Sequence, residues 1–330
     1  MSGSTSGAAG ARPRLVGLDW GTTSLRAFLI GADGAVQQTR QAADGVQALA
    51  GCGAAAFEAA LSRITDGWPV LPRVACGMVG SAQGWQEVPY ADTPADAAAL
   101  MAGATTVAVA DGAPLLVAPG VIHRPGGVAP DATHAHARVA PDVMRGEETQ
   151  VMGALRRGAP DSAVFVLPGT HSKWVVVDQG RIVSLRTAMT GELFALLRAH
   201  SILGRLMVAD AGDADDAAGF DRGLDAARSA DAEGDLLHAL FSTRTRSLVG
   251  ELPHAQGAGY LSGLLVGSEL QAMLARVPAA APLLLVGDDA LCRRYARALQ
   301  AAGRSAAAVL GNTAPDGLAA LARAAGLLAP

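Results

Sequence analysis

A short apolar run, a polar turn and a second apolar run follow one another over residues 15–30, LVGLDWGTTSLRAFLI. The pattern predicts a β-hairpin, because each run is typical of a strand and the turn is rich in glycine and hydroxyl residues. A glycine turn at Asp33-Gly34 then leads into a third predicted strand over residues 35–41. We therefore expect a three-stranded meander at the start of the fold.

The same succession occurs a second time, with the turn glycine at Gly169 instead of Gly21, an offset of 148 residues. Strand, turn and strand now read VFVLPGTHSKWVVV, and a glycine turn again leads to a third strand, over residues 181–187. Two matching meanders indicate a duplicated α/β domain whose halves face each other across a cleft. The copies differ at two positions, because Leu167 replaces Asp19 and Lys173 follows the second turn.

The remaining patterns predict further helices and strands. Helices are expected over residues 54–64, 93–103, 146–157, 191–203, 235–246 and 292–301, and strands over 73–79, 107–110, 115–122 and 283–291. A surface loop is expected over 123–141 and a solvated acidic segment over 210–235. These assignments divide the chain into a disordered start at 1–14, an N-terminal lobe at 15–160 and a C-terminal lobe at 161–330.

Both turns carry residues that suit a phosphate group, because small side chains leave backbone N–H groups unhindered. The predicted phosphate contacts are Gly21, Thr22, Thr23 and Ser24 in the first turn and Gly169, Thr170, His171, Ser172 and Lys173 in the second. Asp19 is placed to hold Mg²⁺ through water, since Mg²⁺ that bridges phosphates keeps several of its own waters. For the first turn taken alone, an ordinary tight hairpin is an equal alternative.

Lys173 is the only lysine among the 26 basic residues of the chain. A chain that uses arginine wherever either cation serves is expected to keep lysine where a guanidinium does not fit. A phosphate-binding turn is such a place. The alternative is a surface lysine retained by chance.

Composition narrows the classes of function. Of the 330 residues, 50% are hydrophobic and 17% charged, and the net charge is −4, so a large core is available and nucleic acid is a poor partner. The three cysteines are scattered, which favours free thiols in a reducing compartment. Neither a signal peptide nor an apolar run of roughly 18 residues is evident, so we expect a cytoplasmic protein without a membrane partner. A homodimer is left open.

The two turns resemble the phosphate motifs of the actin, hexokinase and heat-shock chaperone superfamily. That resemblance implies a two-lobed, ribonuclease H-like α/β fold, duplicated around a central nucleotide cleft. Three longer blocks are similar to the 2-keto-3-deoxy-galactonokinase family: GMVGSAQGWQEVPY at 77–90, RGEETQ at 145–150 and LPGTHSKW at 167–174. This similarity implies a kinase that uses ATP and Mg²⁺ to phosphorylate the C6 hydroxyl of 2-dehydro-3-deoxy-D-galactonate, in galactonate catabolism.

Within the resemblance, Gly287, Asp288 and Leu291 fall on the adenosine motif, although Gly-Asp at a helix start is also a common cap. Two other functions are carried as alternatives. One is a kinase of another sugar or sugar acid with the same fold, and the other is a non-catalytic regulator that senses sugar or nucleotide. The regulator is disfavoured because acids stand at both expected catalytic positions, Asp19 and Glu147.

Phosphoryl transfer to a hydroxyl needs a carboxylate that accepts the proton. Glu147 resembles the catalytic base at the same relative place in FGGY carbohydrate kinases. Glu148 is expected instead to complement the positive end of a helix. Asp142 is a weaker candidate for the base.

Substrate contacts are expected in and after the block at residues 77–90, namely at Ser81, Gln83, Trp85, Glu87 and Arg145. Arg145 suits the carboxylate of a sugar acid, and Arg124 is a second candidate. Trp85 either stacks on the carbon chain or packs in the interior. A zinc site at His123, His134 and His136 is discounted, because no cysteine or acid completes a ligand set. A Walker A motif is absent, since Ser172 rather than glycine precedes Lys173.

Overall fold

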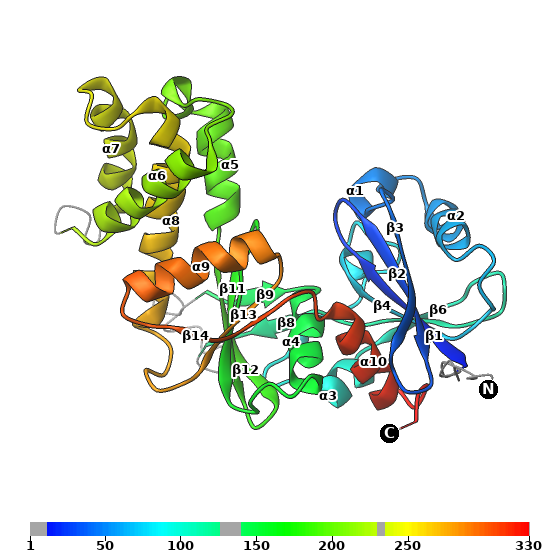
Figure 1. The fold of residues 1–330 in the computed structure, drawn as a ribbon. Helices are drawn as coiled ribbons and strands as arrows, with labels where there is room; N and C mark the ends of the chain where they lie inside the picture. The colour runs from blue at the N-terminus through cyan, green and yellow to red at the C-terminus, as the bar shows by residue number, and fades with distance from the viewer. Residues whose placement is uncertain (1–11, 126–139, 230–234, 330) are drawn as a thin grey trace, which may run out of the picture. The chain divides into compact units, whose positions relative to one another are not determined.

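The computed structural model describes residues 12–125, 140–229 and 235–329, and it divides into two compact units (Figure 1). Unit 1 comprises residues 1–161, 177–184 and 312–330, and unit 2 comprises residues 162–176 and 185–311. The first change of unit therefore falls beside the expected boundary at residue 160. The expected lobes did not include the return of residues 177–184 and 312–330 to unit 1.

Unit 1 is built on a mixed sheet with strand order β3-β2-β1-β4-β7-β6. Its strands are β1 (Pro13–Trp20), β2 (Leu25–Gly31), β3 (Val36–Ala42), β4 (Arg73–Gly77), β6 (Thr105–Val107) and β7 (Leu115–Val117). β2 pairs antiparallel with β1 and β3, which confirms the first predicted meander. β4 runs parallel to β1, with Asp19 beside Cys76, so the carboxyl ends of these two strands meet at one edge of the sheet.

A smaller sheet in unit 1 has the order β5-β8-β9, with β5 (Ala91–Asp92), β8 (Val121–His123) and β9 (Asp142–Met144). The prediction of one strand over residues 115–122 was wrong, because β7 and β8 belong to different sheets. Pro119-Gly120 separates them, and proline cannot donate to a strand ladder. The predicted disorder of residues 1–14 was wrong at its end, since β1 begins at Pro13, and residues 1–11 lie outside the described part.

The helical segments of unit 1 are α1 (Val46–Leu49), α2 (Ala54–Ile64), η1 (Met78–Gly80), α3 (Ala97–Ala102), α4 (Glu147–Arg156) and α10 (Ala314–Ala324). α3 begins later than expected because the Asp96 carboxylate caps it by accepting from the Ala99 N–H. α10, which the sequence patterns did not reveal, packs closely on α4. A Cβ atom at Gly153 or Gly317 would lie 1.9 Å from a backbone oxygen of the facing segment, so glycine is required at this contact.

The five-stranded sheet has the order β12-β11-β10-β13-β14, and most of its residues belong to unit 2. Its strands are β10 (Ala163–Leu167), β11 (Ser172–Asp178), β12 (Arg181–Ala188), β13 (Leu283–Val286) and β14 (Ala306–Leu310). β10, β11 and β12 lie where the second meander was predicted, which confirms the repeat. β13 runs parallel to both β10 and β14.

The helical segments of unit 2 are α5 (Thr190–His200), η3 (Gly204–Leu206), α6 (Asp213–Ala227), α7 (Leu236–Leu248), η5 (His254–Gln256), α8 (Gly257–Leu274) and α9 (Asp289–Ala301). The prediction of a solvated segment over 210–235 was wrong for α6, which buries Phe220 and Leu224. Cβ atoms at Gly219 and Gly223 would lie 2.1–2.2 Å from backbone oxygens at α8, so these glycines let the two helices approach closely. The acidic composition of the segment concealed this apolar face.

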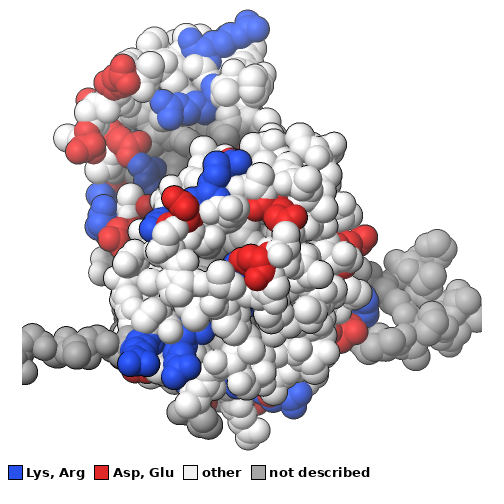
Figure 2. All heavy atoms as spheres, turned by 90° about the vertical axis from the view of Figure 1, so that its right-hand side faces the viewer, with Lys and Arg blue, Asp and Glu red and all other residues white. Residues whose placement is uncertain are grey.

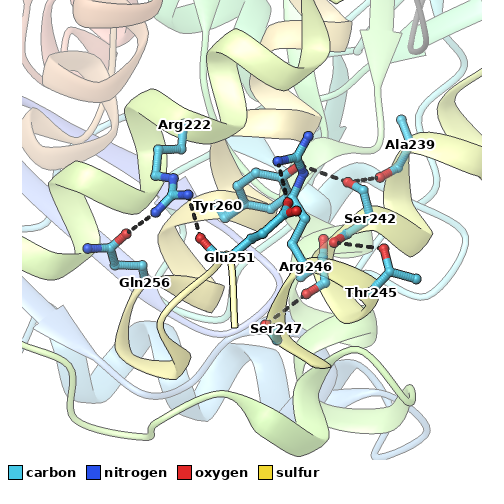
Figure 3. Close-up of polar contacts among 10 residues, drawn as sticks. Arg222, Ala239, Ser242, Thr245, Arg246, Ser247, Glu251, Gln256 and Tyr260 are labelled. Atoms are coloured by element: carbon cyan, nitrogen blue, oxygen red, sulfur yellow. Dashed lines mark hydrogen bonds and ion pairs between the residues drawn. The ribbon is translucent and has the colours of Figure 1, made fainter. Parts of the chain in front are cut away.

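Polar contacts join α6, α7, α8 and the segment between the last two (Figure 3). The Arg222 guanidinium donates to the Glu251 carbonyl at 2.5 Å, and the Ser242 and Tyr260 hydroxyls lie 2.8 Å apart. Arg246 forms an ion pair with the Glu251 carboxylate at 3.2 Å. These contacts hold the helices of unit 2 together around the buried Tyr260 ring.

Charged side chains on the face drawn in Figure 2 occur as small groups of both signs among uncharged residues. Within the described ranges, no helix combines the length and the apolar character needed to cross a membrane.

Candidate active site

The first turn, Gly21 to Ser24, closes with a hydrogen bond from the Gly21 N–H to the Ser24 carbonyl at 2.9 Å. We call this turn the first tip. The start of α1 supports it from behind, because the N–H groups of Val46 and Gln47 donate to its carbonyl groups at 3.0 and 2.9 Å. A Cβ atom at Gly45 would lie 2.3–2.5 Å from the tip backbone, so only glycine permits this approach. The Thr22 and Thr23 side chains are exposed beyond the supported backbone.

Asp19 precedes the first tip at the end of β1, and its side chain is 23% exposed. Arg26, on the paired strand β2, lies 3.5 Å from the carboxylate. Burial raises the pKa of Asp19, and the charge of Arg26 counteracts part of this rise. The residue therefore presents one partly accessible carboxylate beside the tip.

The start of α4 carries the candidate bases. Both oxygens of Glu148 accept from the Gly146 N–H, at 2.9 and 2.7 Å, and the side chain is fully buried. Burial, and secondarily the charge of Glu147, raises the pKa of Glu148 from 4.5 to about 8. Glu147 is half-buried, and its Oε2 accepts from the Arg145 N–H at 3.1 Å. Of the two glutamates, only Glu147 has a side chain that is partly accessible.

The candidate carboxylates Asp19, Glu147 and Glu148 all influence the thiol of Cys76. Cys76 is fully buried at the end of β4, and burial raises the pKa of its thiol well above the ordinary value. The charges of Asp19, Glu148 and Glu147 raise this pKa further, and the Thr149 side chain lowers it. The predicted base and the predicted metal-binding acid, which stand far apart in the sequence, therefore both act on one thiol.

Arg145 and Ser81 supply polar atoms without partners in the described structure. The Arg145 guanidinium donates through Nη2 to the Val88 carbonyl at 2.8 Å and lies 4.3 Å over the Tyr90 ring. Its Nε and Nη1 atoms are buried and lack a hydrogen-bond partner, as does the Ser81 Oγ. Buried polar atoms without partners are costly, so these atoms suit a polar ligand. Gly80, the residue before Ser81, lies against the guanidinium, since a Cβ atom at Gly80 would lie 2.9 Å from Arg145 Nη1.

The other predicted substrate residues differ in their surroundings. Gln83 and Glu87 are exposed on the segment that follows η1. Trp85 packs on Phe57, with ring centroids 6.0 Å apart, and on Trp20, at 6.1 Å, in the core of unit 1. The contacts of Trp85 therefore agree with the interpretation that this residue packs in the interior.

Arg124, the second candidate for the substrate carboxylate, and Asp142, the weaker candidate for the base, have other neighbours in unit 1. Arg124 pairs with Asp92 at 3.1 Å, and Asp142 lies in register with His123 in the small sheet. Most of the loop expected over 123–141 lies outside the described residues, including His134 and His136. In the part of the chain that the structure describes, no group of histidine, cysteine and acidic side chains is arranged to hold a metal.

The second tip, Pro168 to His171, repeats the support of the first. The Glu192 N–H near the start of α5 donates to the Thr170 carbonyl at 2.9 Å. A Cβ atom at Gly191 would lie 2.4 Å from the Gly169 carbonyl oxygen, so a glycine again permits the approach of a helix. Thr170 and His171 are exposed, and the His171 ring contacts the Glu192 carboxylate. Each tip thus rests on the first residues of the helix that follows its meander.

Ser172 and Lys173 lie in β11 and not in the turn itself. Ser172 is fully buried, and its hydroxyl donates to the carboxylate of Glu269 at 2.7 Å. Because neighbouring strand residues point to opposite faces, Lys173 lies on the other face of the sheet. Lys173 is 6% exposed, and its Nζ donates to the Thr187 Oγ1 at 2.8 Å. Its burial excludes the interpretation as a solvated surface lysine.

A pocket of about 360 Å³ lies between α5, α6, α8 and α9 of unit 2 and reaches the second tip at Gly169. Its volume falls in the range of small-molecule sites. Leu291 lines it, together with Arg294, which bonds Ser262 at 2.8 Å and pairs with Asp216. Asp288 caps α9 through the N–H groups of Ala290 and Leu291, which is the alternative interpretation given above. Gly287 adopts a φ of +133°, which favours glycine at the turn before this cap.

Two α/β units that carry the same meander, each with a polar tip supported by a helix start, define a duplicated α/β protein. The family model described as 2-keto-3-deoxy-galactonokinase matches residues 19–321. The 2-dehydro-3-deoxygalactonokinase of Escherichia coli (strain K12) is 37% identical over 304 residues, which cover 91% of this chain and 94% of that protein. The chain belongs to the 2-keto-3-deoxy-galactonokinase family.

A solved structure agrees with this membership. It is a crystal structure from Sinorhizobium meliloti, named as a candidate 2-dehydro-3-deoxygalactonokinase, with a TM-score of 0.78 and 33% identity. The match covers 96% of this chain and 99% of that chain. The α/β class and the family resemblance predicted from the sequence are thereby confirmed.

Proposed function

We propose that this protein transfers the γ-phosphoryl group of ATP to the C6 hydroxyl of 2-dehydro-3-deoxy-D-galactonate, giving 2-dehydro-3-deoxy-6-phosphogalactonate and ADP. Family membership carries the reaction class. The observation in the structure that supports it most is in unit 1, where Asp19, at the end of β1, and Glu147, at the start of α4, both raise the pKa of the Cys76 thiol in β4. The reaction belongs to galactonate catabolism. Cytoplasmic location and a homodimer stay predictions.

Glu147 is proposed as the base that orients the C6 hydroxyl and accepts its proton. Glu148 is less suited, because it is buried and its raised pKa of about 8 keeps it protonated at neutral pH. Protonated Glu148 cannot accept a proton. Its bonds to the Gly146 N–H instead stabilise the start of α4.

Arg145 and Ser81 are proposed to bind the carboxylate and a hydroxyl of the sugar acid. The unpartnered Nε and Nη1 of Arg145 offer charge-assisted hydrogen bonds, and the Ser81 hydroxyl offers a further donor. Gln83 and Glu87 are exposed on the same segment and are proposed as hydroxyl contacts. Trp85 is proposed to shape this site by its packing on Phe57.

The tips are proposed to bind phosphate through backbone N–H groups and the hydroxyls of Thr22, Thr23, Ser24 and Thr170, with His171 and Lys173 as nearby cations or donors. For Ser172, whose hydroxyl is buried, the backbone is the contact proposed. The pocket beside Leu291 is proposed to take the adenosine, with Gly287 and Asp288 shaping its edge. Asp19 fits Mg²⁺, because a single partly accessible carboxylate suits an ion that keeps its waters. Bound Mg²⁺ would neutralise phosphate charge.

A coupled assay of ADP release tests the reaction. The panel contains 2-dehydro-3-deoxy-D-galactonate, its C4 epimer and an uncharged deoxy sugar, with phosphorus NMR of the product to locate the phosphate. We expect turnover with the galactonate acid and phosphate at C6. Preference for another sugar acid would support the related kinase, and nucleotide binding without turnover of any acid would support the regulator.

Substitution at α4 tests the base. Glu147→Gln should abolish phosphorylation while ADP affinity stays at the wild-type value, because the base acts on the sugar and not on the nucleotide. Glu148→Gln is the matched control one residue away and should retain most activity. Equal activity in the two variants would favour Asp142 as the base.

A further inference from the structure

A buried carboxylate lies beneath the second tip. Glu269 of α8 is 6% exposed, and the sequence analysis did not identify it. In the described structure its carboxylate accepts hydrogen bonds from Ser172 Oγ at 2.7 Å, Trp174 Nε1 at 2.7 Å, Thr190 Oγ1 at 2.5 Å and Tyr295 Oη at 2.6 Å. Oε1 takes the first two and Oε2 the last two, which uses the acceptor capacity of both oxygens.

The four partners are neutral donors, so the structure satisfies this carboxylate by hydrogen bonds. Burial of a charge without such partners is strongly unfavourable. An apolar core would avoid the problem altogether, and therefore stability alone gives no reason for an acid at this position.

The positions of its four hydrogen-bond partners explain why an acid stands at position 269. Ser172 follows the last residue of the second tip, and Thr190 precedes Gly191, the residue whose small size lets α5 support that tip. Tyr295 and Thr190 both line the pocket between α5 and α9. One carboxylate thus connects the end of the tip, its supporting helix and the wall of the adjoining pocket.

We propose that Glu269 is a positioning residue for nucleotide, which holds the second tip and α5 in the arrangement that binds phosphate. The proposal rests on the proposed role of this tip in ATP binding. Glu269 contacts no substrate in it. Its effect comes from preorganisation, since a tip that is already ordered loses less entropy when it binds phosphate.

The hydrogen-bond donors around Glu269 predict which substitution of this residue will disturb the second tip more. Trp174 Nε1 can only donate, so a glutamine at 269 must keep its oxygen toward Trp174 and Ser172. The amide group then faces Thr190 and Tyr295, whose hydroxyls can rotate to accept. Glu269→Gln should therefore preserve the bond to the tip, whereas Glu269→Ala removes every acceptor.

The experiment measures the KM values for ATP and for the sugar acid, and the Kd of ADP by calorimetry. Glu269→Ala should raise the KM for ATP and the Kd of ADP about tenfold, and Glu269→Gln by less than about threefold, with the KM for the sugar acid unchanged in both. Leu270→Ala, a buried neighbour on α8, is the control for general destabilisation. It should lower the thermal midpoint without changing either nucleotide value.

Ser172→Ala keeps the proposal testable if Glu269→Ala fails to fold. Ser172→Ala should raise the KM for ATP, and it should do so by the same factor in the Glu269→Gln background, because the glutamine oxygen still accepts from Ser172. Wild-type ADP affinity in Ser172→Ala and Glu269→Ala would overturn the proposal. A KM for the sugar acid that rises with that for ATP would also overturn it.

Lys173→Met separates failure of this inference from failure of the proposed phosphate site. If Lys173→Met impairs turnover while the variants of Glu269 and Ser172 bind ADP normally, the second tip binds phosphate without help from Glu269. If Lys173→Met, Ser172→Ala and Glu269→Ala all behave as wild type, the tip is not part of the ATP site and both proposals fail.

Discussion

The first and second tips share a backbone arrangement and differ in the side chains around it. In both, a glycine at the start of the following helix lets backbone N–H groups reach the carbonyls of the turn, Gly45 in unit 1 and Gly191 in unit 2. Asp19 precedes the first tip, whereas the buried Leu167 holds the equivalent position before the second. Lys173 follows the second tip, whereas its equivalent after the first, Leu25, lies in the core.

The comparison shows which features of the two tips are shared and which have diverged. Backbone support is common to both copies, because it depends on glycine and on main-chain geometry rather than on particular side chains. Charge is divided between them, an acid in unit 1 and a cation in unit 2. We infer that the shared frame binds phosphate and that the differing residues separate metal binding from stabilisation of phosphate charge.

Asp19→Asn gives the sharpest test of this division. The variant should fold normally but lose about 10²–10³-fold in kcat, because Mg²⁺ would lose its anionic ligand. Steady-state kinetics across a range of Mg²⁺ concentrations measure the effect. Asp66→Asn, an exposed acid of the same unit, should be unaffected. Near wild-type turnover with unchanged Mg²⁺ dependence would assign the metal to another residue.

Lys173→Arg tests the cation of the second tip. The buried site holds an ammonium that donates to Thr187, and a planar guanidinium should not fit, so we expect kcat to fall about tenfold to a hundredfold. The KM for the sugar acid should change little. Arg186→Lys, an exchange at an exposed position of β12, is the control. Full activity of Lys173→Arg would show that catalysis does not depend on the ammonium group of Lys173.

Gly45→Ala and Gly191→Ala test the feature that the tips share. Each added methyl group would lie under 2.6 Å from backbone atoms of its tip, so the turn must move. We expect the KM for ATP to rise about tenfold in each variant, and thermal unfolding measures any loss of stability. Gly212→Ala, with open space around it and no positive φ, should match the wild type. A raised KM for ATP in only one of the two variants would show that the two tips do not contribute equally to ATP binding.

Glu148→Gln tests the buried acid of unit 1 and should have the smallest effect on activity. The folded-state pKa of about 8 exceeds the ordinary value of 4.5, so the stabilisation is complete below pH 4.5 and is lost as the pH rises toward 8. The variant should remove this loss, so that its free energy of unfolding exceeds that of the wild type above pH 8. Urea unfolding at several pH values measures it. Parallel curves for both proteins would show that Glu148 ionises normally.

Much of the fold could be predicted because local sequence patterns reveal many of its strands and helices, and one of these patterns occurs twice. The two meanders, α2 and the helix at α4 follow from strand alternation, glycine turns and helical composition within short windows. The packing of α6 on α8 could not be predicted in this way, because its glycines permit contact with a helix far along the chain. The return of α10 to unit 1 is likewise a long-range event.

The sequence by itself determined the repeated meanders and the family, since these depend on residue types at fixed spacing. Only the tertiary structure decided that Ser172 and Trp174 share the carboxylate of Glu269, because that acid stands in an otherwise uncharged helix almost 100 residues away. The structure also distinguishes the surroundings of Glu147 from those of Glu148. Glu147 keeps a partly accessible side chain, whereas burial raises the pKa of Glu148 to about 8.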